Sequence, residues 1–430
     1  MQCIIWKTLS ANAQAQLLTR PIDTNQIVAE QTPVVIAKIR QEGDVALKEL
    51  TKRYDNVELT QFGVTQQEFA LAQTLVTPAA MTAIERAAAQ INVFHQPQKP
   101  SGIELETSPG IQCETQVRPI QRVGLYVPGG SAPLLSTVLM LGIPSKIAAC
   151  PLRILCSPPR SDGSLDPHIL VAAKICGIDQ VYKVGGAQAI AAMAYGTATI
   201  PKVDKIFGPG NAWVTQAKQL VALDPQGAAC DMPAGPSEVM VLADKYANPA
   251  FVAADLLSQA EHGKDSQAIL VATDLVLANQ VLAEIEIQLQ NLSRIEIATA
   301  ALQHSRALVV ENMDQALVIA NQYAAEHLIL QVDNPRQYVG KIVNAGSVFL
   351  GPWSPEAVGD YASGTNHVLP TYGYAHSYSG LSVKDFMKTI SFQELTREGL
   401  LDIARTVTTL ADIEGLQAHA HAVRVRLKTK

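Results

Sequence analysis

Apolar residues in the first part of the chain recur with a helical period. Between residues 25 and 89 they stand at spacings such as Val35, Ile39, Leu47 and Leu50, with polar residues between them. A period near 3.6 residues is typical of helices that bury one face. We therefore expect this opening section to be mostly helical.

From residue 121 onward, short β-rich runs alternate with helical segments. The predicted strands are 123–127, 153–156, 181–184 and 205–207, followed by 238–243, 268–272, 307–310, 327–332 and 347–350. The helices predicted between them include 187–195, 212–223 and 313–325. Such alternation is typical of parallel sheets covered by helices. The predicted fold class is therefore α/β, with two Rossmann-like parallel-sheet units and helical N-terminal and C-terminal segments.

Loops rich in Gly and Pro indicate how the chain divides. The loop 231–236 separates the two runs of strands, and a second stretch, 351–380, is rich in Gly, Pro, Ser and Tyr. Long irregular loops in compact domains are usually functional. After it, residues 382–427 return to helical spacing. We expect an N-terminal arm (1–24), a first α/β unit with its helical lead-in (25–120 plus 236–381), a second α/β unit (121–235) and a C-terminal helical segment (382–430).

Composition narrows the class of protein. Of the 430 residues, 48% are hydrophobic and 17% are charged, which excludes disorder driven by charge. The net charge of −6 and the lack of a Lys/Arg cluster on any candidate helix argue against a nucleic-acid partner. The most apolar segment, 134–143, is too short for a membrane helix, and the N-terminus carries no secretory signal. Six cysteines without C-x-x-C spacing are typical of reduced thiols, so we expect a cytoplasmic protein. With a nucleic-acid partner disfavoured by the charge, we expect a small-molecule enzyme.

Three glycine-rich turns follow predicted strands and precede predicted helices. They are Gly129-Gly130, Gly185-Gly186 and Gly208-Pro209-Gly210-Asn211. Glycine lets the backbone approach a phosphate, and the helix N-terminus beyond it favours an anion. Each turn could equally be a simple tight turn. The dinucleotide fingerprint G-x-G-x-x-G is absent, so the pattern alone supports a nucleotide only weakly.

Gln259 and His262 lie three residues apart near the end of a helix that we expect to begin at Asn248-Pro249 and to end before Gly263. Side chains at this spacing are neighbours, and the C-terminal end of a helix favours a cation. The pair could hold a metal ion. It could also be a polar helix cap, which is the commoner use of such a pair.

Glu326 and His327 stand where a predicted helix gives way to a predicted strand. An acid beside an imidazole suits proton transfer, although a histidine at a helix end often only contacts carbonyl groups. Further candidates in the loop 351–380 are Asp360, His367 and His376, which an irregular backbone can direct into a cleft. The C-terminal segment adds Glu414, His419 and His421, for which a surface position is the alternative.

Several ordered motifs together resemble the histidinol dehydrogenase family. The matching stretches cover almost the whole chain from Arg40 to the C-terminal segment: 123–133, 185–190, 205–211, 231–238, 258–263 and 359–367. The resemblance implies oxidation of L-histidinol through the aldehyde to L-histidine with two NAD and one water, the last steps of histidine biosynthesis. It also implies a zinc-dependent homodimer, with the second unit binding NAD, the first carrying most of the zinc and substrate site, and the C-terminal segment serving dimerisation.

The resemblance also assigns roles to individual residues. The zinc (Zn²⁺) ligands would be Gln259, His262 and Asp360 from one chain with His419 from its partner. His327 would move the protons of both oxidations, and Glu326 would activate the water that hydrates the aldehyde. The residues that would contact the substrate besides these are Ser237, His367 and Glu414, the last from the partner chain, and those that would contact NAD are Tyr126, Gln188 and Asn211.

Two other classes remain open at this level. An aldehyde dehydrogenase would need a cysteine nucleophile, yet none of the six cysteines lies in the matched acid–base motifs. A zinc-stabilised binding protein would keep the fold without the chemistry. The acid–base pair Glu326 and His327 argues against it, because binding alone does not require one.

Overall fold

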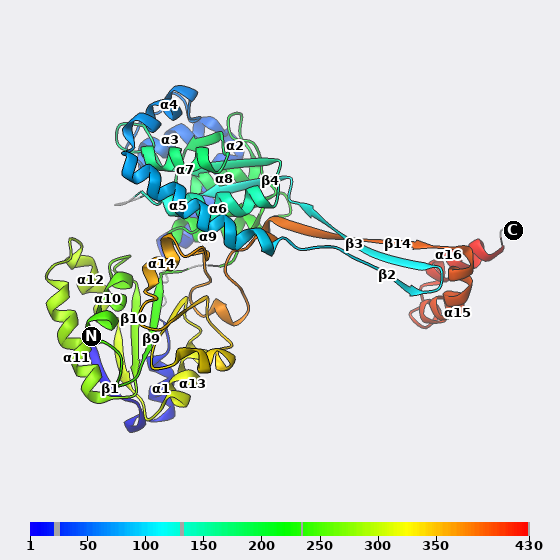
Figure 1. The fold of residues 1–430 in the computed structure, drawn as a ribbon. Helices are drawn as coiled ribbons and strands as arrows, with labels where there is room; N and C mark the ends of the chain where they lie inside the picture. Colours follow the sequence, from blue (N-terminus) through cyan, green and yellow to red (C-terminus); the bar gives the residue numbers. More distant parts are fainter. Residues whose placement is uncertain (21–25, 130–132, 234, 429–430) are drawn as a thin grey trace.

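The computed structural model describes residues 1–20, 26–129, 133–233 and 235–428. Gly130 of the first predicted phosphate turn, the motif residues 131–132 and Ala234 lie outside this description. The chain forms two α/β lobes and a long extension that carries the C-terminus away from both (Figure 1). The predicted α/β class with two parallel sheets is confirmed.

The six-stranded lobe is built on a parallel sheet of order β1-β11-β10-β9-β12-β13. Its strands are β1 (Gln2–Ile5), β9 (Glu238–Ala243), β10 (Gln267–Ala272), β11 (Arg306–Val309), β12 (His327–Gln331) and β13 (Ser347–Leu350). One face packs on α10 (Pro249–Ala260), α11 (Leu275–Leu289) and α12 (Ile295–Gln303), and the other on α1 (Ala11–Leu17) and α13 (Met313–Tyr323). Val239 and Val241 point to the first core while Met240 and Leu242 point to the second, so β9 is buried on both faces.

The five-stranded lobe has a parallel sheet of order β6-β5-β4-β7-β8. Its strands are β4 (Arg122–Tyr126), β5 (Leu152–Ser157), β6 (Gln180–Lys183), β7 (Lys205–Phe207) and β8 (Ala229–Cys230). The helices next to it are α6 (Leu135–Ile147), α7 (Pro167–Ile175), α8 (Gly186–Tyr195) and α9 (Ala212–Leu223). All nine predicted strands of the two sheets are present, each end within one residue of its predicted position.

The helices of residues 26–95 pack on the five-stranded lobe, whereas we expected them to belong with residues 236–381. These helices are α2 (Gln26–Glu42), α3 (Asp44–Tyr54), α4 (Gln66–Leu75) and α5 (Pro78–His95). The physical reason lies in α6 and α8, which are buried on nearly every side. A helix that is apolar all round needs a second layer of helices over it, and this section supplies that layer.

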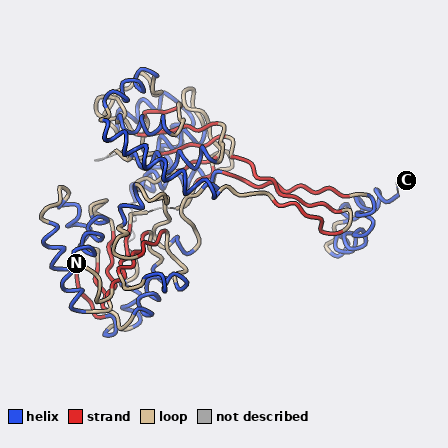
Figure 2. Tube along the Cα trace, viewed as in Figure 1, coloured by secondary structure: helices blue, strands red, loops and turns tan. Residues whose placement is uncertain are grey.

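The extension consists of an antiparallel sheet of order β14-β3-β2 and two terminal helices (Figure 2). Its elements are β2 (Ile103–Ser108), β3 (Ile111–Pro119), β14 (Met387–Leu395), α15 (Arg397–Ile413) and α16 (Gln417–Lys428). The expectation of helix throughout 382–427 is therefore wrong for residues 387–395. Thr389, Ile390 and Phe392 favour a strand, and all nine residues of β14 pair in register with β3.

The loop 351–380 is less irregular than expected, because it contains α14 (Glu356–Tyr361). Beyond it, Val368, Leu381 and Phe386 join the core of the five-stranded lobe, so the chain returns there before entering β14. The short 3-10 helices are η1 (Trp6–Thr8), η2 (Gln96–Gln98), η3 (Pro335–Lys341), η4 (Tyr374–His376) and η5 (Val383–Phe386). Within the described ranges, no helix has the length and apolarity needed to cross a membrane.

Candidate functional site

The last turn of α10 brings Gln259 and His262 together. The Asn248 side chain accepts from Ala250 N at 2.9 Å and caps the helix start, as expected. The helix ends at Ala260, so His262 lies just beyond it, with its backbone N donating to Gln259 O at 3.2 Å. The Gln259 side chain is fully buried, and its Oε1 has no hydrogen-bond partner within the described chain.

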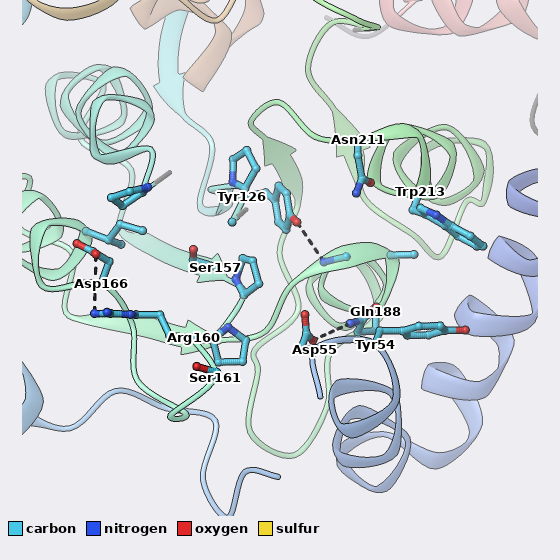
Figure 3. Close-up of a pocket in the computed structure, with 18 of the residues that line it drawn as sticks. Tyr54, Asp55, Tyr126, Ser157, Arg160, Ser161, Asp166, Gln188, Asn211 and Trp213 are labelled. Atoms are coloured by element: carbon cyan, nitrogen blue, oxygen red, sulfur yellow. Dashed lines mark hydrogen bonds and ion pairs between the residues drawn. The ribbon is translucent and has the colours of Figure 1, made fainter. Parts of the chain in front are cut away.

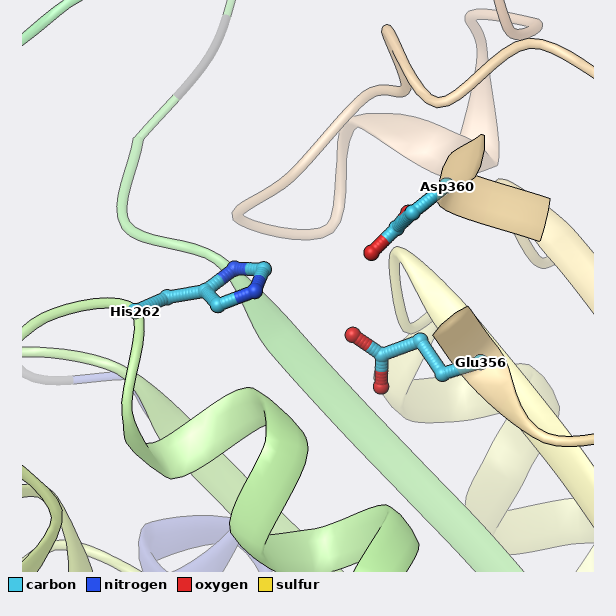
Figure 4. Close-up of side chains that lie close together, drawn as sticks. All are labelled: His262, Glu356 and Asp360. Atoms are coloured by element: carbon cyan, nitrogen blue, oxygen red, sulfur yellow. The ribbon is translucent and has the colours of Figure 1, made fainter. Parts of the chain in front are cut away.

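Helix α14 carries two carboxylates to the same place. Glu356 and Asp360 are four residues apart, which puts them on one face of the helix. One potential ligand atom from each, together with one from His262, lies within 4.8 Å of the others (Figure 4). We did not predict Glu356. Its spacing from Asp360 was the available signal, but it has meaning only if the segment is helical.

The donor set fits a metal ion. The Gln259 oxygen and both Glu356 oxygens are buried without partners in the described chain, and burial raises the pKa of Asp360 to about 6. Burial, followed by Asp360 and Glu326, raises the pKa of Glu356. A bound cation would compensate this buried negative charge. Imidazole nitrogen with carboxylate and amide oxygens suits zinc, and also manganese or cobalt.

Two predicted residues do not reach this place within one chain. Glu414 follows α15 and His419 lies on α16, at the far end of the extension from the lobe that holds His262 (Figure 1). His421 lies on the same terminal helix.

The predicted candidate His376 lies away from the site. It is exposed and contacts the backbone oxygen of Gln322 at 3.2 Å, and it does not line the cavity described below.

Glu326 and His327 are buried at the start of β12. Helix α13 ends at Tyr323, and the left-handed φ of 53° at the next residue, Ala324, turns the chain toward the strand. The Glu326 Oε2 accepts from Glu238 N at 3.0 Å. The His327 Nδ1 lies 3.8 Å from Glu326 Oε2 and 3.8 Å from Glu356 Oε1, and Nε2 lies 3.7 Å from Asp360 Oδ1. Burial lowers the pKa of His327 to about 3, so its imidazole is neutral at pH 7 and can accept a proton.

His367 connects the two lobes. Its Nδ1 lies 3.0 Å from the backbone oxygen of Asp360, and its Nε2 lies 3.2 Å from Thr137 Oγ1 on α6. A carbonyl oxygen can only accept, so Nδ1 carries the proton and Nε2 accepts from the threonine. Burial lowers the pKa of His367 to about 4, which agrees with this neutral form.

These residues meet at a cavity of about 1030 Å³ between the lobes. Its lining includes Ser237, His262, Glu326, His327, Asp360 and His367 from one side and Thr137 and Asn211 from the other. Neutral bases, carboxylates and a candidate metal site around one cavity can bind a polar molecule and move protons to and from it. Among the described residues that line the cavity none is a cysteine, and Cys150, Cys156 and Cys176 are buried elsewhere, so this lining offers no thiol for nucleophilic attack.

A second cavity, of about 790 Å³, lies in the five-stranded lobe (Figure 3). Tyr126, Gln188 and Asn211 line it, and Asn211 also lines the first cavity. The Tyr126 hydroxyl accepts from Gly186 N at 3.1 Å, at the start of α8. The Gln188 amide lies 3.5 Å from a carboxylate oxygen of Asp55, which sequence reasoning missed. The predicted glycine turns that are described therefore do begin helices beside a cavity.

Known proteins resemble the chain along its whole length. A family model described as histidinol dehydrogenase matches residues 18–427. Histidinol dehydrogenase of Vibrio vulnificus (strain YJ016) is 53% identical over 429 residues, with 100% of this chain and 99% of that protein covered. Histidinol dehydrogenase of Xanthomonas oryzae pv. oryzae is 52% identical over 431 residues, covering 99% of each. The crystal structure of histidinol dehydrogenase from Elizabethkingia anophelis superposes with a TM-score of 0.95 at 48% identity, covering 100% of this chain and 98% of that one.

Proposed function

The chain belongs to the histidinol dehydrogenase family, and on this premise we propose that it oxidises L-histidinol to L-histidine through L-histidinal. It is an NAD-dependent oxidoreductase of histidine biosynthesis. The observation that carries the proposal is the meeting of His262 and Asp360 with Glu326 and His327 at one cavity. A cytoplasmic location would supply NAD and keep the cysteines reduced.

The metal site would hold zinc through Gln259, His262 and Asp360 and through the partner subunit's His419. The unpartnered Gln259 Oε1 and the compact group of His262 with two carboxylates support this assignment. Bound zinc would supply two positions for the imidazole and the amine of the substrate and so fix its orientation. Ser237, His367 and the partner subunit's Glu414 would complete the contacts with the substrate.

A homodimer would bring His419 and Glu414 to the site. The extension exposes a series of apolar side chains that a second subunit would bury: Ile103, Leu105, Ile390, Phe392, Leu395, Leu410 and Ile413. Apolar surface of this extent favours association, because covering it removes it from water. The extension leaves its own lobes, so each protomer would deliver these two residues to the other.

Proton transfer would rest on two side chains. In the first oxidation His327 takes the alcohol proton while a hydride leaves the carbinol carbon. Glu326 then takes a proton from the water that adds to the aldehyde, while His327 returns its proton to the carbonyl oxygen, which gives the hydrated aldehyde and leaves His327 neutral again. In the second oxidation His327 takes a proton from that hydrate as the second hydride leaves, and the carboxylate of L-histidine results.

The cavity of the five-stranded lobe would bind NAD through Tyr126, Gln188 and Asn211. NAD, when bound there, is the hydride acceptor of both oxidations. Asn211 supports this assignment because it lines both cavities and so lies where the cofactor and the substrate would meet.

The experiment that tests the proposal measures NADH formed per L-histidinol consumed, with product analysis, before and after chelation and zinc readdition. Two NADH and L-histidine, lost on chelation and restored by zinc, are expected. One NADH with released aldehyde would contradict the role of Glu326. No NADH from folded, zinc-loaded dimer would contradict the proposed function as a whole.

A further inference from the structure

Glu356 is a buried carboxylate with no hydrogen-bond partner for either oxygen in the described chain. It is 1% exposed and lies 3.8 Å from His327 Nδ1. We propose that Glu356 is a positioning residue for His327, accepting a hydrogen bond from Nδ1–H so that Nε2 is the nitrogen that meets the substrate. This inference rests on the proposed function, in which His327 moves the protons of both oxidations.

The two ring nitrogens of His327 have different surroundings. Nδ1 lies near the carboxylates of Glu326 and Glu356, and Nε2 lies near Asp360 Oδ1 at 3.7 Å. The Glu326 Oε2 that approaches Nδ1 already accepts from the backbone of Glu238. Glu356 differs from Glu326 in that neither of its oxygens has another hydrogen-bond partner in the described chain, so its carboxylate is the one left to accept from Nδ1. Contacts of this kind are often long without ligands and tighten in the substrate complex.

Glu356 adjoins His327, which lines the cavity, but does not line the cavity itself. Glu326, His327 and Asp360 all line the cavity, whereas Glu356 does not. A substrate in the cavity can therefore touch the imidazole but not this carboxylate. The arrangement matches the acid–imidazole pair of other enzymes, in which a buried carboxylate fixes the tautomer of the base without contacting the substrate.

The backbone of Glu356 is anchored to the helix that carries the candidate metal ligands. Asp255 lies one turn before Gln259 on α10, and its carboxylate accepts from the backbone N–H of Glu356. Gln331 of β12 donates to the same Asp255 carboxylate at 3.0 Å. Helix α14 is thus tied to α10 and β12 at the residue that bears the Glu356 side chain, which limits its movement away from His327.

A role as metal ligand is the alternative for Glu356, because its carboxylate also lies near His262 and Asp360. The two roles predict different defects when Glu356 is replaced. A missing ligand lowers zinc content, and excess zinc restores activity. A missing positioning residue lowers kcat in enzyme that still holds its zinc, with little change in KM.

The test compares Glu356→Gln, Glu356→Asp and the control Glu296→Gln in zinc-loaded full-length enzyme. Glu296 also lies in the first turn of a helix but is exposed and remote from the cavity. We expect Glu356→Gln to lower kcat by about 10²-fold, with KM for L-histidinol within about 3-fold and zinc content unchanged. Glu356→Asp should restore part of kcat because it keeps the charge, and the control should match wild type.

Three results would overturn the inference: a kcat within about 2-fold of wild type, a loss of zinc whose restoration recovers full turnover, or a rise in KM at constant kcat. If Glu356→Gln does not fold, Glu356→Asp decides alone, since a carboxylate set back by one methylene should still lower kcat at constant KM. A wild-type enzyme that fails to give two NADH per L-histidinol would contradict the proposed function and not this inference alone.

Discussion

Asp360 Oδ1 lies 3.7 Å from His327 Nε2, although the two residues come from different elements of the six-stranded lobe. Asp360 lies in the last turn of the short helix α14, and His327 begins the strand β12. A group held by a metal at Asp360 would therefore lie beside the nitrogen that accepts its proton. Substrate binding and proton transfer can therefore take place within one small region. Two successive oxidations without release of the aldehyde require this proximity.

Replacing His327 with Asn tests the base. Because a positioned general base contributes about 10² to 10⁴ in rate, turnover should fall by at least 10²-fold while zinc content stays normal. Steady-state kinetics and metal analysis of the same preparation check this. The control is His304→Asn, at an exposed histidine that lines neither the cavity between the lobes nor the cavity of the five-stranded lobe. Near-normal turnover of His327→Asn would reject its role.

His419 and His421 form a matched pair on α16. Only His419 is assigned to zinc, so His419→Asn should lower the zinc content of the purified dimer and His421→Asn should leave it unchanged. Both changes remove an imidazole from the same exposed helix, so their effects on helix stability are similar. Equal zinc content in the two variants would contradict the assignment.

Subunit exchange tests whether the site is shared. His419→Asn and Asp360→Asn should each be inactive, but a heterodimer of the two has one site with both residues intact. Mixing the variants under exchange conditions should restore up to about half the activity per heterodimer, as expected for one of two sites in a two-fold dimer. Exchange is followed independently with a mass or affinity label. Proven exchange without recovered activity would show that each chain supplies its own ligands.

The sequence predicted the two parallel sheets well because their strands are continuous apolar runs. Strands such as β9 are buried on both faces, and a run of that kind between turn residues has few alternatives. The extension was missed for the opposite reason. β14 is exposed along nearly its whole length in one chain, and it pairs with β3, from which it is separated by more than 260 residues of sequence. Neither burial nor local spacing signals such a strand.

The site residues that belong to a sequence motif were predicted. Those that reach the site only through the packing of distant elements were not. Gln259, His262 and Asp360 came from the family resemblance, and the structure brings them together. Glu356 was missed because its relation to Asp360 exists only once residues 356–361 are helical. Asp255 and Thr137 act through contacts between distant elements, which no local pattern reports.

Lys218 holds the turn that precedes Asn211. It donates to Gly208 O at 2.8 Å and pairs with Asp231, whose other oxygen accepts from Gly208 N at 2.7 Å. Lys218→Met should lower the free energy of unfolding by about 3–5 kcal/mol, because Asp231 is left buried without its cation. The looser turn should also raise KM for NAD several-fold. Thermal unfolding and NAD kinetics measure the two effects.

A second substitution separates the charge of Asp231 from the geometry of the turn. Lys218→Met combined with Asp231→Leu should recover much of the stability, since no unpaired buried charge remains. It should not recover KM for NAD, because Gly208 N has lost its acceptor. Lys202→Met, at a half-buried lysine that donates to Gln226 O, is the control. Full recovery of both quantities would show that the turn does not depend on the pair.

Asp55 gives a pH-dependent prediction, because burial beside the cavity of the five-stranded lobe raises the pKa of its carboxyl to about 6. The unfolded pKa is about 3.9, so the folded state binds more protons between these values and loses stability as pH rises through them. Asp55→Asn removes that loss. It should stabilise the NAD-free protein by about 1 kcal/mol at pH 7.5, discounted for partial solvation, and by little at pH 4.5. Denaturant unfolding at both pH values measures this, with Asn at the exposed Asp333 as the control. An equal gain at both pH values would show that the effect is not the ionisation of Asp55.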